Sequence, residues 1–398
     1  MTSTLNENHS GATVVIAYGE SFRPQLWHSS LKKCGYRCVT VSDVSSLRDC
    51  LHDFPDLLLL DWTLSENVSR SLWEALELDC QTAEVPCLVF PDTLYSYPDW
   101  VAGCLRRLDD LDELLGKVAS QLKIARLSRD LNLAHEKLIA KQFQLDESLK
   151  SAAHIQKSLV PANAPRVSRF SFSWQFLPCE RVGGDLFNIH WLDETTLVAY
   201  VLDVSGHGIP SAMMTVSISQ ALSSQGGQLL KHHSDQPPFY EIVPPDQVLA
   251  ELDQEYPFER FEMFFSICYM LIDVRTGHVR YSNAAHPPPV LVRADGTMQM
   301  LDAGGTIIGL GGLVPFEEGQ TELFPGDRLF LYTDGIAEAS NSAGDFLGDD
   351  RFRKMLNDGG EVPLATVCED VVGAVYEFCG EMKVQDDITL LGIEFCSP

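Results

Sequence analysis

Four short acidic motifs lie far apart in this chain of 398 residues, and each places an aspartate beside glycine or at the end of an apolar run. The motifs are VGGD at 182–185, DVSGHG at 203–208, YTDG at 332–335 and QDDIT at 385–389. Each motif alone is typical of a turn, because Asp and Gly are common turn residues. Carboxylates gathered in one place repel one another, and a divalent cation with oxygen ligands offsets that repulsion. Taken together, Asp185, Asp203, Asp334 and the Asp386–Asp387 pair indicate a site for Mg²⁺ or Mn²⁺, since zinc favours His or Cys.

The segment that must position these aspartates, residues 161–398, alternates short apolar runs with turn dipeptides. Its expected strands include FSFSW, TTLVAYVLDV, FSICYMLIDV, HVRYSNA and RLFLYTDG, with helices near 210–224 and 362–380. Many strands with a few helices predict an α+β or layered α/β domain. Adjacent strand residues point to opposite faces, so only one of Asp386 and Asp387 can face the cations. We expect Asp386 in that role and keep Asp387 as the alternative ligand.

Residues 1–110 show a different texture, in which apolar runs alternate with amphipathic stretches. The runs are ATVVIAY, CVTV, DLLLLDW and VPCLVF. Strands that alternate with helices predict a doubly wound α/β domain with a parallel sheet. The run DLLLLDW is continuously apolar, as a strand buried on both faces must be, and it ends at Asp61, where functional residues of open α/β sheets are found.

Residues 111–160 predict one long helix that joins the two domains. The segment has no proline and a single glycine before Pro161, and its apolar residues recur every seven positions. One seam consists of Ile124, Leu131, Leu138, Leu145 and Ala152, and the second of Leu127, Ala134 and Ile155, with Lys141 and Ser148 as interruptions. This spacing favours a parallel coiled-coil dimer over a helix packed along its own chain.

Bulk composition excludes several classes of partner. The formal net charge of −27 opposes binding to nucleic acid. No apolar stretch approaches the length of about 18 residues that a membrane span requires. The 11 cysteines are scattered and show no close-paired zinc spacing, so they indicate reduced thiols in a cytoplasmic protein.

The order of the motifs resembles the PPM family of metal-dependent Ser/Thr protein phosphatases, in the bacterial branch that contains stage II sporulation protein E and the RsbU-like regulators. The likeness runs from IQKSLVP at 155–161 to the end of the chain, through ERVGGDLF, LDVSGHGIPSAMM, YSNAAHPPPVL, GDRLFLYTDGIAEASN and QDDITLLGI. It implies a sandwich of two antiparallel sheets flanked by helices. It also implies a protein-serine/threonine phosphatase that uses two divalent cations, Mn²⁺ or Mg²⁺.

The resemblance assigns roles to individual residues. Asp185 and Asp203 would flank the cations together with the Val204 carbonyl, and Asp334 and Asp386 would complete the site. This sequence departs from the family at several positions. Ser205 stands where eukaryotic members have a His, Arg181 stands where the bacterial branch has Glu and could contact phosphate, and Ala285 replaces a glycine before His286.

The N-terminal domain resembles a response-regulator receiver, in which Asp61 takes the place of the phosphate-accepting aspartate. Its cation-binding acidic pair is reduced to Glu20, and its lysine is replaced by Arg106 or Arg107. We therefore expect a degenerate receiver that binds an upstream regulator, with phosphorylation of Asp61 as the alternative. The family resemblance implies a phosphorylated anti-anti-sigma factor of the STAS type as substrate. A signalling scaffold without catalysis is the competing hypothesis.

Overall fold

The computed structural model describes residues 11–67, 69–82, 84–90, 97–223, 229–359 and 362–396. The chain divides into two compact units, Met1–Phe143 and Gln144–Pro398. None of the helices in the described ranges combines the length and the apolar character needed to cross a bilayer.

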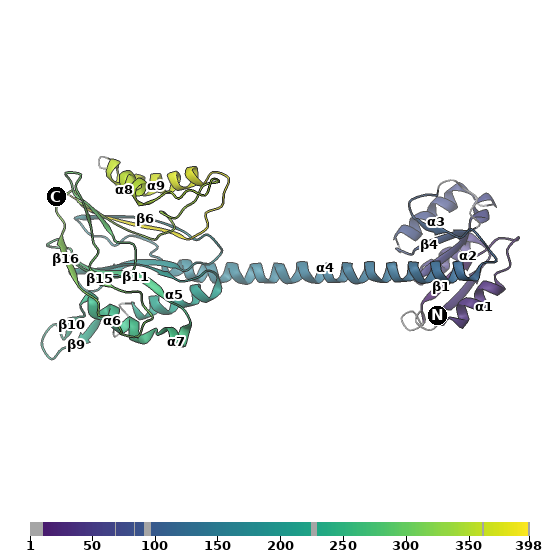
Figure 1. Cartoon of the computed structure of the whole chain (residues 1–398), viewed down its shortest axis with the longest axis horizontal. Helices are drawn as coiled ribbons and strands as arrows, with labels where there is room; N and C mark the ends of the chain where they lie inside the picture. Colours follow the sequence, from purple (N-terminus) through teal and green to yellow (C-terminus); the bar gives the residue numbers. More distant parts are fainter. Residues whose placement is uncertain are drawn as a thin grey trace. The chain divides into compact units, whose positions relative to one another are not determined.

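The N-terminal unit is built on a parallel five-stranded sheet (Figure 1). Its strands are β1 (Thr13–Ala17), β2 (Arg37–Val41), β3 (Leu57–Asp61), β4 (Cys87–Phe90) and β5 (Val101–Cys104), in the order β2-β1-β3-β4-β5. The connecting helices are α1 (Gln25–Lys33), α2 (Val44–Leu51), the 3₁₀ helix η1 (Trp62–Asn67) and α3 (Arg70–Thr82). This order is that of doubly wound folds, and it confirms the predicted parallel α/β sheet.

Both faces of this sheet are covered, as the apolar run of β3 predicted. One face packs Leu58 and Leu60 against Leu47 of α2 and Leu76 of α3. The opposite face packs Leu57 and Leu59 against Trp27 and Leu31 of α1 and against the first turns of α4 (Leu111–Leu159). Strands buried on both faces need apolar residues at every position, which explains the absence of alternation in this segment.

Helix α4 is one continuous helix of 49 residues. Its first turns bury Leu114, Val118 and Leu122 in the N-terminal unit, and its last turns bury Gln156 in the C-terminal unit. Between them the predicted coiled-coil stripe is exposed, with Leu131 at 69% and Leu138 at 63%. The predicted helix is confirmed, and its stripe has no intramolecular cover among the described residues.

The C-terminal unit is a sandwich of two sheets with helices on both outer sides (Figure 1). The first sheet contains β7 (Asp185–Trp191), β8 (Thr196–Val204), β11 (Phe265–Asp273), β12 (His278–Ala284), β15 (Gly304–Gly305) and β16 (Gly319–Glu322). The second contains β6 (Phe170–Leu177), β13 (Val290–Val292), β14 (Met298–Met300), β17 (Arg328–Tyr332) and β18 (Ile388–Phe395). All pairs are antiparallel except β12 with β15. The two predicted sheets are therefore present.

Helices complete the outer layers of the sandwich. The helices are α5 (Ile209–Ala221), α6 (Pro245–Glu255) and α7 (Phe258–Phe261) beside the first sheet, and α8 (Asp349–Asp358) and α9 (Leu364–Cys379) beside the second; a small hairpin pairs β9 (Lys231–His233) with β10 (Tyr240–Ile242). Strand β8 shows how the layers arise, because Leu197, Ala199 and Val201 face the second sheet. The alternate residues Val198, Tyr200 and Leu202 face the helices. This two-residue period is what an internal strand between two layers requires.

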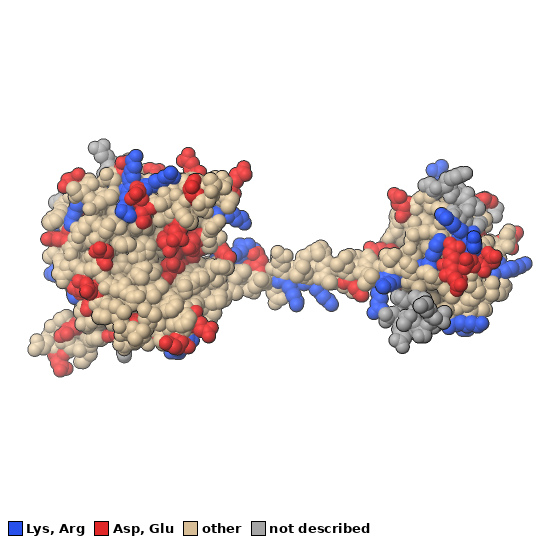
Figure 2. Space-filling model, in the orientation of Figure 1, with Lys and Arg blue, Asp and Glu red and all other residues tan. Residues whose placement is uncertain are grey.

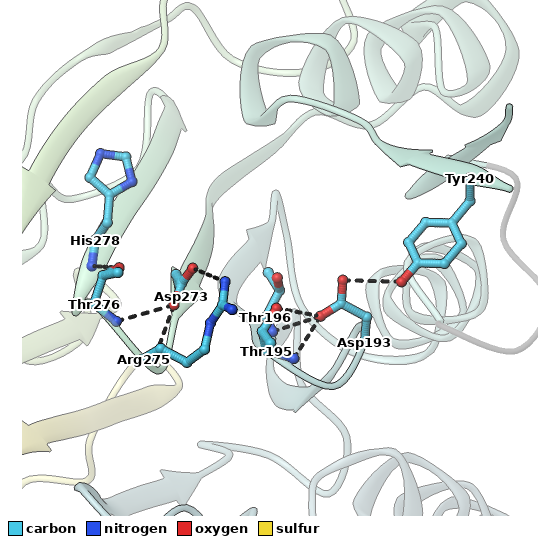
Figure 3. Close-up of polar contacts among 8 residues, drawn as sticks. All are labelled: Asp193, Thr195, Thr196, Tyr240, Asp273, Arg275, Thr276 and His278. Carbon is cyan, nitrogen blue, oxygen red and sulfur yellow. Dashed lines mark hydrogen bonds and ion pairs between the residues drawn. The ribbon is translucent and has the colours of Figure 1, made fainter. Parts of the chain in front are cut away.

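Two aspartates of the first sheet serve only as turn residues. Asp193 accepts hydrogen bonds from the backbone N–H groups of Thr195 and Thr196 and from the Tyr240 hydroxyl, and Asp273 binds Arg275 and Thr276 in the same way (Figure 3). These hydrogen bonds lower the pKa of both carboxyls despite partial burial. Both residues stabilise hairpins at the end of the sheet opposite to Asp185 and Asp203.

Candidate cation site

The first two candidate aspartates face each other across one strand pair. Asp185 opens β7, Asp203 lies next to last in β8, and the two are directly opposite in the antiparallel register. Like charges in this position repel. Burial and then the charges of Asp203 and Asp387 hold the pKa of Asp185 well above its usual value. Burial and then the charges of Asp334, Asp386 and Asp387 raise the pKa of Asp203 to about 7.

The second sheet brings the remaining candidates to the same end of the sandwich. Asp334 follows β17 and Asp386 precedes β18, and these strands are neighbours. Burial and the charge of Glu338 raise the pKa of Asp334, and burial together with Asp334 and Asp387 raises that of Asp386. Strand ends of both sheets thus gather carboxylates that were up to 201 positions apart in sequence.

Asp386 and Asp387 have different surroundings although they are adjacent. Asp387 is 5% exposed, and its carboxylate accepts hydrogen bonds from the backbone N–H of Cys179 at 2.8 Å and of Asp185 at 3.2 Å. Asp386 is exposed, and its charge acts on Asp203. Asp387 therefore positions the backbone of the site, whereas the Asp386 carboxylate accepts the backbone N–H of Asp387 through Oδ1 at 2.8 Å.

Cys179 lies against this pair, with ligand atoms of the three residues within 4.8 Å of one another. Burial and the Asp387 charge raise the pKa of the Cys179 thiol to about 12. A neutral thiol is a poor ligand for a hard cation, since metals bind the thiolate. Cys179 was not predicted as a site residue. It lies beside the carboxylates, but its thiol is neutral and does not supply the negative charge that a cation ligand would.

Two threonines orient Asp185, and reasoning from sequence missed both. The hydroxyls of Thr333 and Thr389 donate to Asp185 Oδ2 at 2.7 Å and 2.6 Å. The Thr389 backbone N–H in turn donates to the Thr333 hydroxyl at 3.0 Å. The only available signal was their presence inside the YTDG and DDIT motifs. Such bonds fix a carboxylate's direction and support its charged form.

Glycines bring the backbone close to these acids. A Cβ on Gly184 would lie 2.5 Å from the Val204 carbonyl oxygen and 3.3 Å from Asp203 Oδ1. A Cβ on Gly183 would lie 2.0 Å from Asp387 Oδ2. The VGGD loop can therefore carry only glycine at both positions, which explains why the Val204 carbonyl lies beside the carboxylates.

The last turns of α4 hold the same loop. The Gln156 side chain donates from Nε2 to the Gly183 carbonyl at 2.8 Å and accepts at Oε1 from the Gly183 N–H at 3.1 Å. The Asn188 side chain donates to the Leu159 carbonyl at 3.1 Å. Gln156 was not predicted, although it belongs to the IQKSLVP motif. These bonds satisfy both backbone groups of Gly183 in a buried setting.

The other sequence candidates have local partners. Arg181 forms an ion pair with Asp146 of α4 at 2.5 Å, so its charge is already engaged. The Ser205 hydroxyl accepts from the Phe264 N–H at 3.0 Å, and His207 lies 3.3 Å from Glu180. His286 is buried, and burial lowers its pKa to about 3.

The turn before His286 is fixed by the Asn283 side chain, which bonds the His286 backbone on both sides. Ala285 has φ of +50° in this turn. Glycine adopts this left-handed conformation more readily than alanine does. The Asn283 side chain therefore fixes the backbone of the turn, and the His286 ring lies with Nδ1 2.7 Å from the Ser266 hydroxyl.

The donor set fits a hard divalent cation. The charges that raise the pKa of Asp185 and Asp203 are all carboxylates. Figure 2 shows that acidic side chains also gather in a compact group on one face of this unit. Partly buried carboxylates with raised pKa values, joined by a backbone carbonyl, match the oxygen ligands of Mg²⁺ or Mn²⁺. Asp185, Asp203, Val204, Asp334 and Asp386 are the residues that would hold it.

The family model "Stage II sporulation protein E (SpoIIE)" matches residues 193–395, which is more than half of the chain. The chain belongs to this family. The matched range contains Asp203 in β8, Asp334 after β17 and Asp386 before β18, whereas Asp185 precedes it.

The chain is also similar to two proteins that are named phosphoserine phosphatases. The chain is 30% identical over 196 residues to the phosphoserine phosphatase RsbP of Bacillus subtilis, covering 48% of this chain and 44% of RsbP. It is 23% identical over 266 residues to the phosphoserine phosphatase RsbU of the same organism, covering 65% of this chain and 72% of RsbU. The chain thus spans less than half the length of RsbP.

A solved structure supports the fold of the SpoIIE-type unit. The SiaA-PP2C domain of Pseudomonas aeruginosa aligns with a TM-score of 0.53 and 24% identity, covering 64% of this chain and 99% of that domain. The two-sheet sandwich is therefore the PP2C-type fold that the PPM resemblance predicted.

Asp61 of the N-terminal unit has a different environment from the aspartates of the candidate cation site. It is 2% exposed, and its carboxylate accepts from the Gly19 N–H at 2.9 Å and from the Thr63 N–H and hydroxyl at 3.1 and 2.7 Å. A carboxylate with both oxygens bonded and buried is a poor nucleophile. Glu20, the remaining acid of the expected cation pair, is exposed.

We therefore expect no aspartyl phosphate at Asp61. Incubation of the full chain with acetyl phosphate and Mg²⁺, followed by phosphate-affinity electrophoresis, should show no shifted band. Asp61→Asn provides the matched control. A band present in the wild type and absent from Asp61→Asn would contradict the degenerate-receiver interpretation.

Proposed function

We propose that this protein is a metal-dependent phosphatase that hydrolyses phosphoserine or phosphothreonine in a partner protein. The observation that carries the proposal is the meeting of Asp185, Asp203, Asp334 and Asp386 at one end of a PP2C-type sandwich. Membership of the SpoIIE family and the names of RsbP and RsbU support the same reaction.

In the proposed hydrolysis, some residues would bind the cations and others would position these ligands. Two divalent cations, when bound, would activate water for attack on phosphorus and neutralise charge on the phosphoryl oxygens. Asp185, Asp203, Asp334 and Asp386 supply the anionic ligands, and the Val204 carbonyl supplies a neutral one. Asp387 holds the backbone N–H of Asp185, and Thr333 and Thr389 hold its carboxylate.

Hydrolysis of p-nitrophenyl phosphate by the purified full chain tests the proposal. We expect activity with Mn²⁺ or Mg²⁺ that is lost in excess chelator and restored by either cation. Persistence of the full rate in chelator would contradict metal dependence. Absence of any rate with both cations, and with a phosphorylated protein, would favour the scaffold hypothesis.

For the physiological substrate we propose a phosphorylated STAS-type anti-anti-sigma factor. This follows from the family resemblance alone. Release of phosphate from such a protein, phosphorylated on serine by its cognate kinase, should exceed release from the same protein after denaturation. Equal rates would indicate that the enzyme recognises only the phosphorylated residue.

We further propose that α4 pairs with the α4 of a second copy and that the N-terminal unit controls the phosphatase through this helix. The exposed seam of Leu131 and Leu138 supports pairing, because large exposed apolar stripes are unfavourable in a monomer. Light scattering should give about twice the chain mass of 44.2 kDa. The Leu131→Lys, Leu138→Lys variant should be monomeric, whereas Lys137→Leu, outside the seam, should remain a dimer. A monomeric wild type would contradict pairing.

A further inference from the structure

A cleft of about 660 Å³ opens beside Asp334, on the side of the second sheet. Its walls come from segments far apart in sequence: the loop after β12, the end of β14, the turn after β17 and the start of α8. We call it the acidic cleft, after Asp302, Glu338 and Asp349 on its rim. Its volume lies within the range of pockets that bind ligands or side chains.

The lining of the acidic cleft combines two chemistries. Pro288, Met300 and Phe346 present apolar surface, and Phe346 is 64% exposed. The rim carries three carboxylates. Asp349 is paired with Arg353 at 3.3 Å. Arg353 also lines the cleft, where Asp349 is its partner, and within the described ranges neither Asp302 nor Glu338 forms an ion pair. Two carboxylates of the rim therefore have no cationic partner.

The acidic cleft is continuous with the proposed cation site. Asp334 belongs to both, since it lines the cleft and its charge acts on Asp203. Glu338 lies near enough to Asp334 for its charge to act on that carboxylate. A phosphorylated residue placed at the cations would therefore have its neighbours in sequence beside the cleft.

We propose that the acidic cleft binds a lysine or arginine side chain of the substrate that lies near the phosphorylated residue in sequence. This rests on the proposed phosphatase function and specifies its substrate class. The aliphatic stem of such a side chain would cover Pro288, Met300 and Phe346, and its cationic head would meet Asp302 and Glu338. Long basic side chains combine an apolar stem with a charged end in this way.

Synthetic phosphothreonine peptides test the proposal on the full chain with Mn²⁺. One series carries a single Lys at each position from three before to three after the phosphothreonine, in an alanine background. Matched series carry Glu or Leu in place of Lys. At one offset we expect Lys to raise kcat/KM over Ala by roughly threefold to tenfold, since two partly exposed charge contacts contribute on this scale. Glu at that offset should lower kcat/KM.

Charge variants connect the preference to the acidic cleft. The Asp302→Asn, Glu338→Gln variant should bring the Lys-to-Ala ratio of kcat/KM close to one. Asp302→Lys, Glu338→Lys should reverse the preference in favour of Glu. The control is Glu377→Gln, an exposed acid on α9 outside the cleft, which should keep the wild-type ratio. Because each ratio is internal to one variant, a general change in rate does not affect it.

The outcomes separate this proposal from the proposed function. The wild type could hydrolyse p-nitrophenyl phosphate and show the same kcat/KM for every peptide. That result would overturn the acidic-cleft proposal alone. A preference for Leu at the best offset, unchanged in the charge variants, would also overturn it, because the cleft would then bind an apolar side chain. No hydrolysis of any substrate would overturn the proposed function instead.

Discussion

Asp203→Asn is expected to lower kcat/KM for p-nitrophenyl phosphate by about 10³-fold or more. Asp203 lies opposite Asp185, and the charges of Asp334 and Asp386 act on it, so it is central to the carboxylate cluster. A neutral amide cannot replace its charge in holding a cation. A loss of about 4 kcal/mol of transition-state stabilisation corresponds to this factor. Steady-state kinetics at saturating Mn²⁺ measure it, and a decrease of less than tenfold would contradict the proposed ligand.

The same variant should be more stable than the wild type when cations are removed. Burial and the neighbouring carboxylates raise the pKa of Asp203 to about 7 in the folded protein, whereas the pKa of an Asp in an unfolded chain is about 3.9. The contribution of this group to stability is therefore greatest below about pH 4 and is lost as pH rises through 7. Urea unfolding in chelator measures the free energy of unfolding at pH 5 and at pH 8. This free energy should decrease less between the two pH values in Asp203→Asn than in the wild type. Equal decreases in both proteins would contradict this reasoning.

Thr389→Val combined with Thr333→Val is expected to weaken cation binding and activity together by about 10-fold to 100-fold. The change removes both hydroxyl donors to Asp185 Oδ2, so the buried carboxylate loses its orientation and part of the support for its charge. Activity titrated with Mn²⁺ should show a higher half-saturating concentration.

Thr389→Ser combined with Thr333→Ser is the matched control for the double valine variant. Serine retains the hydroxyl, so we expect Mn²⁺ dependence within about threefold of the wild type. If the double valine and double serine variants both keep the wild-type Mn²⁺ dependence, the two hydroxyls contribute nothing to the site.

The elements of the fold followed from local patterns because each pattern reflects one environment. The four consecutive leucines of β3 predicted a strand covered on both faces, and the seven-residue repeat predicted α4. The motifs predicted which aspartates gather at one end of the sandwich. Their roles as cation ligands remain predictions.

The remaining features of the site depend on contacts between distant segments. Asp193 lies in the turn after β7 and Asp203 lies next to last in β8. Hydrogen bonds from backbone N–H groups lower the pKa of Asp193 despite its partial burial, whereas burial and other carboxylates raise the pKa of Asp203. Thr333 and Gln156 meet their partners only after the sheets and α4 pack together. No local pattern distinguishes such residues from ordinary core or turn residues.

The distribution of the acids over both sheets should affect how stable the protein is to proteolysis. Asp185 and Asp203 belong to one sheet, and Asp334 and Asp386 flank strands of the other. Without a cation, their repulsion pushes the two layers apart at that edge; with one, the same groups clamp the layers together. Resistance to proteolysis, and with it the amount of this protein in a cell, should then rise and fall with the supply of divalent metal.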